Sequence, residues 1–147
     1  MPVNSNTLPA AQLFVHNVEM SASSQKDAGL SNTQSSPLAG VHRYTSASVM
    51  LEVTQMTAST LNVWLQKRLP DDSNWIDIAS FDQLSAAGNR LVEITAAGNA
   101  QHTPTDGSLA AGTVLTVNLG EEWALSFSVG NAGGGTANFA VWADFFA

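Results

Sequence analysis

Few side chains in this sequence have the types and spacing that catalysis requires. The three histidines, at positions 16, 42 and 102, fall in separate regions, and no pair of them has metal-ligand spacing. The sequence has no H-E-x-x-H motif, no G-x-S-x-G motif, no phosphate-binding Gly loop and no Cys. It therefore offers no set of nucleophile, base and oxyanion donor, and we expect no enzyme and no bound cofactor.

One acidic cluster has side chains that are suited to a metal ion. It consists of Asp71, Asp72, Asn74 and Asp77, whose oxygen atoms are of the kind that Ca²⁺ prefers. The Gly and the distal Glu of the EF-hand pattern are absent, however. Asp and Asn at a turn already have a role in bonding the local backbone. We therefore expect a turn here, and no metal site.

Four tryptophans offer a binding chemistry instead. Trp123 alternates with apolar neighbours and is expected in a core. Trp142 lies on the opposite side of its run from Phe139, Val141 and Phe145. Trp64 is likewise opposite to its apolar neighbours, and Trp75 opens a run beside the acidic turn. A large aromatic side chain on an outer surface usually marks an interface, and it can also stack on a sugar ring. Trp64, Trp75 and Trp142 are therefore candidate interface residues.

The stretch 46–81 contains the elements that must position two of these tryptophans. Residues 49–55 and 61–66 each place an apolar side chain at every second position, which predicts strands with one buried face. The short polar stretch 57–60 suits a hairpin between them. The stretch 69–74 then turns the chain back into a third strand at 75–81, and Pro70 predicts that the second strand ends near Leu69.

Four later runs continue the two-residue period, at 90–95, 113–119, 123–129 and 137–146. No stretch sustains a helical period. About eight strands with long connections at 25–43 and 96–112 predict an all-β fold, an antiparallel β-sandwich of jelly-roll type. The expected core residues are Leu51, Val53, Leu61, Val63, Leu65, Leu125, Phe127, Val141 and Phe145.

Residues 1–45 differ from the rest in composition. They are rich in Ser, Asn and Gln and contain one apolar run, 13–18. We interpret them as an N-terminal arm or loop with a first strand, and residues 46–147 as the jelly-roll sandwich, within one domain overall. An alternative is that residues 1–12 order only against a partner. Leu13 and Phe14 are accordingly further candidate interface residues.

Composition excludes several classes of partner. The formal net charge is −7, and the five Lys and Arg residues are scattered, so nucleic-acid binding is not expected. No run approaches the ~18 apolar residues of a spanning helix, and the N-terminus lacks a secretory signal, so we expect no membrane association and no usual export. Only 12% of residues are charged, against a typical ~25%. Such a surface suits a protein that is packed against others.

The segment LEVTQMTASTLNVWLQKRLPDDSNWIDIASFDQLSAAGNRLVEI resembles a family of small phage virion proteins. The similar features are two successive strands, a charged turn, a W-x-D-[IL] strand at Trp75 to Ile78, and Phe81. These proteins are similar to jelly-roll capsid decoration, or cement, proteins of tailed bacteriophages, which have no catalytic residues to transfer. This chain lacks the Gly that is common in that turn.

The resemblance implies a structural protein that binds the major capsid protein on the outside of a phage head. It also implies a homotrimer that is made in the host cytoplasm and located on the virion surface. Two alternatives stay open: a phage tail or fibre component, and a carbohydrate-binding β-sandwich module.

Overall fold

The structure is a computed structural model, and it describes residues 11–16, 33–34, 37–68, 74–96, 101–130 and 136–146. The elements along this part of the chain are β1 (Ala11–His16), β2 (Thr33–Gln34), β3 (Leu38–Ala39), the 3-10 turn η1 (Val41–Arg43), β4 (Ser46–Met56), β5 (Thr60–Arg68), β6 (Trp75–Ser80), β7 (Gly88–Thr95), β8 (Glu122–Gly130) and β9 (Ala137–Phe146).

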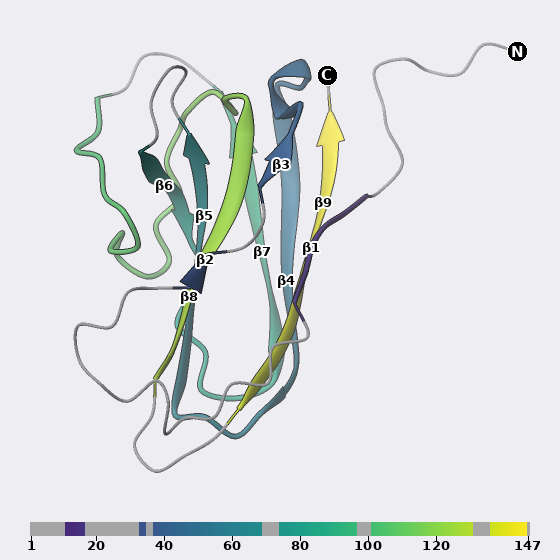
Figure 1. Cartoon of the computed structure of the whole chain (residues 1–147), viewed down its shortest axis with the longest axis vertical. Coiled ribbons are helices and arrows are strands. Elements are labelled where there is room, and N and C mark those ends of the chain that lie inside the picture. The colour runs from purple at the N-terminus through teal and green to yellow at the C-terminus, as the bar shows by residue number, and fades with distance from the viewer. Residues whose placement is uncertain are drawn as a thin grey trace, which may run out of the picture.

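The strands form two antiparallel sheets that pack face to face (Figure 1). One sheet has the order β1-β9-β4-β7. The other has the order β2-β8-β5-β6, and β3 also pairs with β8. Because β2 and β3 both pair with β8, they count as one interrupted strand. The two sheets then have the orders 1-8-3-6 and 2-7-4-5, which is the jelly-roll topology. The predicted antiparallel jelly-roll sandwich is thereby confirmed.

The two-residue period of the sequence builds the core between the sheets. In β4 and β9, buried side chains alternate with partly or fully exposed ones along most of each strand. The inward residues meet across the sandwich, where the rings of Phe127 and Phe139 pack edge to face with their centroids 5.1 Å apart. All nine core residues expected from the sequence are buried in this one cluster.

The hairpin that was predicted at 57–60 is wrong. β4 pairs with β7 and β9, whereas β5 pairs with β6 and β8, so residues 57–59 carry the chain from one sheet to the other. The amides of Thr57 and Ala58 donate to the carbonyl of Thr136, which ties this crossing to the start of β9. A short polar connection suits a crossing as well as a hairpin, and the strand pairing was therefore not determined by the local sequence. The predicted return from the second strand to the third is confirmed by the β5–β6 pair.

The strand that was predicted at 113–119 is also wrong. Only Val114 forms a bridge, with Ala79 of β6. Beyond it, the alternating apolar residues are used for packing rather than for pairing. Val117 packs against the core, Leu119 is buried, and the carbonyl of Leu119 accepts a hydrogen bond of 2.7 Å from the indole of Trp123. The segment therefore leaves the sheet edge after a few residues.

The first strand expected at 13–18 is present as β1, which pairs with β9 and ends at His16. Ala11 and Gln12, placed in a possible arm by the sequence, belong to this strand. Residues 1–10, 17–18 and the acidic turn residues Asp71 and Asp72 lie outside the described residues.

Lys67, near the end of β5, is a buried charged residue, and its burial makes the stability of the fold depend on pH. The residue is 8% exposed, and its ammonium donates to the carbonyl and the side-chain oxygen of Asn118 at 3.1 and 3.0 Å. Burial lowers the pKa of the Lys67 ammonium below its ordinary value of 10.5. Between that lowered value and 10.5, the folded chain binds fewer protons than the unfolded chain. The free energy of unfolding therefore rises with pH in this window.

We expect Lys67→Met to remove this rise, because Met keeps the buried stem and loses the titrating group. Urea unfolding of both proteins at several pH values between neutrality and 10.5 measures the difference. If the free energies of unfolding of the two proteins change with pH in parallel over this whole range, burial of Lys67 does not penalise its charge.

Candidate functional site

The outer face of the four-stranded sheet carries one row of apolar side chains. Antiparallel pairing places Met50 of β4 opposite Trp142 of β9 on one side and opposite Leu91 of β7 on the other. Leu91 is 62% exposed, Trp142 is 38% exposed and Met50 is half-buried. Cross-strand neighbours on one face lie about 4.5–5.5 Å apart, so these three residues make a continuous apolar row across three strands. We call this the Trp142 row.

Carboxylates lie on both sides of the Trp142 row. One neighbouring register row contains Asp144, Ser48 and Glu93, and in it the Ser48 hydroxyl donates to the Glu93 carboxylate at 2.5 Å. The row on the other side contains Glu52 of β4. Among the described residues of β4, β7 and β9, the one Lys or Arg is Arg90, whose side chain pairs at 3.3 Å with Asp82 in a loop that follows β6. The face around the Trp142 row is therefore acidic.

The outer face of the five-stranded sheet has a different environment, because the loop of residues 101–119 lies over Trp64 and Gln66 of β5. This loop is drawn in green beside β6 in Figure 1. Trp64 of β5 points away from the core, as its position in the sequence predicted, but it is only 8% exposed. Its indole nitrogen donates to the carbonyl of Leu109 in the loop at 2.9 Å. Trp64 is therefore packed under the loop and is not available on the described surface.

Asp77 of β6 fastens the same loop. Its carboxylate is buried and accepts hydrogen bonds from the hydroxyl of Thr105 and from the backbone amides of Gly107, Ser108 and Leu109, at 2.8 to 3.1 Å. The amide of Gln66, itself buried, donates to Asp77 at 2.9 Å. The oxygens of Asp77 thus bind protein donors, and Asp77 acts as an anchor for the loop rather than as the metal ligand considered above.

The other candidate residues are distributed over the two sheets. Trp75 is half-buried at the start of β6, with the guanidinium of Arg68 5.7 Å from its ring centre, and Arg68 also pairs with Glu122. Trp64 and Trp75 belong to one sheet and Trp142 to the other, so the structure does not bring the three together. Leu13 and Phe14 lie in β1, next to β9, and their side chains lie outside the described part.

Sequence reasoning missed Met50 and Leu91. The available signal was the alternation of side chains along each strand. Met50 and Leu91 are apolar residues at positions that face the polar side of their strands, as Trp142 is. The three residues fall into one row only when the strand order β9-β4-β7 and its register are known.

The described residues show no group of three or more His, Asp or Glu side chains placed to hold a metal ion. His42 lies exposed in η1, and the ring of His102 is 3.2 Å from the carbonyl of Thr116. Within the same part of the chain, no helix has the length and apolar character needed to cross a membrane.

Comparisons of the chain with protein-family models, curated proteins and solved structures find no match. Within the described part of the chain, the acidic face with its Trp142 row is an exposed surface that combines an aromatic side chain, apolar neighbours and carboxylates.

Proposed function

We propose that this chain is a non-enzymatic structural virion protein, a capsid decoration or cement protein that binds the major capsid protein on the outside of a phage head. The observation that carries the proposal is the Trp142 row. It is an apolar strip on a sheet face, rimmed by Glu52, Glu93 and Asp144, whereas the chain's own loop lies over Trp64 on the opposite sheet. A partner surface with an apolar centre and basic flanks is complementary to this face.

The resemblance of residues 51–94 to small phage virion proteins directs the choice of partner. The composition agrees with it, because a chain with 12% charged residues suits a packed environment, and a net charge of −7 disfavours contact with packaged DNA. We propose a homotrimer at the threefold sites of the lattice, made in the host cytoplasm and added to the assembled shell. Each copy needs only a modest interface, because the second and third contacts of a trimer form at high effective concentration.

A carbohydrate-binding module is a second candidate, and Trp142 favours it. An exposed indole beside carboxylates offers both a stacking surface and hydrogen-bond acceptors for a sugar. In that case, immobilised glycans should retain the protein through Trp142, and phage heads should not bind it. A tail or fibre component would bind tails in place of heads.

The variant Trp142→Ser tests the proposal, with Trp75→Ser as its matched control on the other sheet. Loss of a central aromatic from an interface typically costs about 2 kcal/mol or more, which is about a 30-fold loss of affinity. We expect that weakening for Trp142→Ser in co-sedimentation with purified heads, and near-normal binding for Trp75→Ser. Circular dichroism should show that both variants fold. Equal binding by both variants, or loss with Trp75→Ser alone, would place the interface elsewhere.

A further inference from the structure

β6 and β7 are the edge strands of the two sheets on the same side of the sandwich, and their free edges differ in backbone hydrogen bonding. The free edge of β6 is covered by the chain itself: the amides of Asp77 and Ser80 donate to the carbonyls of Thr105 and Thr113, and the amides of Gly112 and Leu115 donate back to Ser80 and Ile78. Among the described strands, β7 is the last of its sheet and has β4 as its one partner. In the described part of the chain, no backbone hydrogen bond reaches its other edge.

An uncovered edge strand presents alternate N–H and C=O groups that are ready to pair with another extended chain. β7 runs for eight residues, from Gly88 to Thr95, and contains no Pro. Its pairing with β4 is regular over this whole length. The edge is therefore long and straight enough to receive a strand of several residues.

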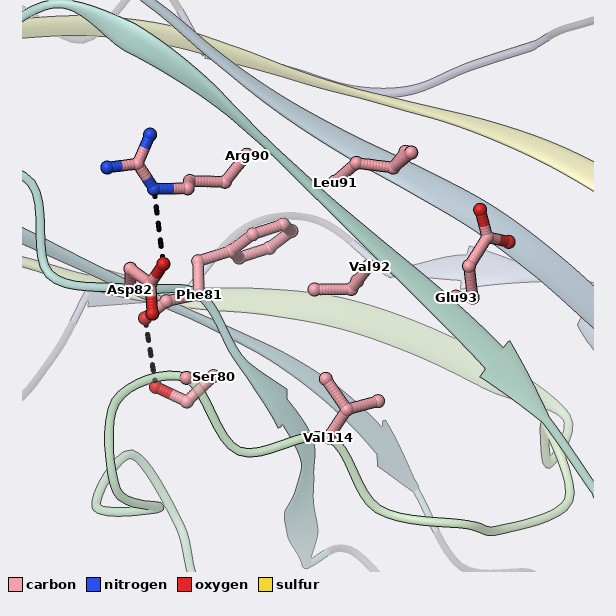
Figure 2. Close-up of a pocket in the computed structure, with 9 residues that line it drawn as sticks. Ser80, Phe81, Asp82, Arg90, Leu91, Val92, Glu93 and Val114 are labelled. Carbon is pink, nitrogen blue, oxygen red and sulfur yellow. Dashed lines mark hydrogen bonds and ion pairs between the residues drawn. The ribbon is translucent and has the colours of Figure 1, made fainter.

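A cleft of about 220 Å³ lies beside this edge (Figure 2). Figure 2 shows Phe81, Val92 and Val114 facing the space between β7 and the loop after β6, while Leu91 lies on the other side of the β7 ribbon. The cleft is smaller than the ~300–1,000 Å³ of a typical small-molecule site. Its lining is mixed, because Ser80, Asp82, Arg90 and Glu93 also border it. Its size and the cluster of Phe81, Val92 and Val114 at its inner side suit a single apolar side chain.

The charges around the edge define the rest of the ligand. Glu93 is exposed on β7, two residues from Leu91, and its one partner that the structure gives is the Ser48 hydroxyl. Arg90, at the other end of the cleft, is already paired with Asp82. An added strand would therefore gain from a Lys or Arg opposite Glu93 and from apolar residues opposite Val92 and Leu91.

From these features we infer that the free edge of β7 is a docking site for an extended segment of another protein, which adds to the four-stranded sheet as a fifth strand. The segment carries a basic residue followed by two apolar ones, in antiparallel pairing with Leu91, Val92 and Glu93. Backbone hydrogen bonds supply the affinity, and the cleft and Glu93 supply the selection. This site shares Leu91 and Glu93 with the acidic face on which the proposed function rests, but it does not include Trp142.

The test uses the full chain and the fluorescent peptide acetyl-TTKVLTT-amide as a probe. In the expected alignment its Lys lies opposite Glu93, its Val opposite Val92 and its Leu opposite Leu91. We expect saturable binding by fluorescence anisotropy and slower amide exchange along residues 88–95 in the complex. N-methylation of the amides that point to one edge of the peptide should weaken binding at least about tenfold, whereas N-methylation of those on its other edge should leave binding unchanged.

Two charge reversals on the protein complete the test. Glu93→Lys should weaken peptide binding by about 3-fold to 10-fold, and the control Glu121→Lys, an exposed residue just before β8, should not. Trp142→Ser should bind the peptide normally, because Trp142 lies on β9, two strands away from the free edge of β7. The inference is overturned if the probe does not bind saturably, or if both N-methylated peptides bind equally well. It is also overturned if sedimentation and amide exchange show a second copy already paired along β7.

Discussion

Asp77→Ala should lower the free energy of unfolding by about 3 to 5 kcal/mol, because the substitution removes the acceptor of five hydrogen bonds at once. A buried donor that is left without a partner costs about 1–3 kcal/mol. Three of the donors are backbone amides of residues 107–109, which cannot turn away without moving the loop. The indole of Trp64 would lose its acceptor, the Leu109 carbonyl, if the loop moved.

Urea denaturation measures this loss, with Asp82→Ala as the control. Asp82 is an exposed carboxylate whose ion pair with Arg90 is worth at most about 1 kcal/mol. Fluorescence should also report greater solvent exposure of tryptophan in Asp77→Ala, since Trp64 would be uncovered. Equal stability of the two variants would mean that the Asp77 network does not hold the loop.

Phe127→Ala should cost about 3 to 5 kcal/mol, because it opens a cavity in the middle of the sandwich. Phe127 is 2% exposed and contacts the ring of Phe139 from the opposite sheet, so its loss removes contacts between the two layers. Phe127 pairs with Val63 in the unbroken β5–β8 ladder, which has little freedom to collapse into the space.

The matched control is Phe146→Ala in β9, where the residue is 39% exposed. Its loss should cost less than about 1.5 kcal/mol, because much of the ring is already in contact with water. Thermal unfolding of the two variants gives the comparison. A similar loss of stability in both would contradict the placement of Phe127 in the core.

The strands and the core could be predicted from the sequence because they depend on local alternation. The alternating apolar residues of β4 and β9 define one buried face of each strand, regardless of which strands pair with it. The partner of each strand could not be predicted in the same way. Residues 57–59 allow either a hairpin or a crossing. The choice is made by the pairing of β4 with β7 and β9, and β7 does not begin until Gly88.

In the candidate site, too, the local pattern predicted the direction of a side chain but not what lies over it. The two-residue alternation along their strands predicted that Trp64 and Trp142 both point away from the core, and both do. Whether such a residue meets water depends on what covers the sheet. A loop more than thirty residues downstream covers Trp64, and that loop is held by Asp77, which the sequence suggested only as part of an acidic turn. The Trp142 row required the register of three strands, which no local pattern contains.

The most direct test of the proposed capsid interface is photo-crosslinking from the Trp142 row. Trp142→benzoylphenylalanine places a reactive ketone on the acidic face, and Trp75→benzoylphenylalanine places the same group on the other sheet. Each protein is added to purified phage heads that lack this chain, and the illuminated products are identified by mass spectrometry. The proposal predicts a product with the major capsid protein from position 142 and none from position 75. Absence of that product from position 142, on heads that have bound the protein, would contradict it.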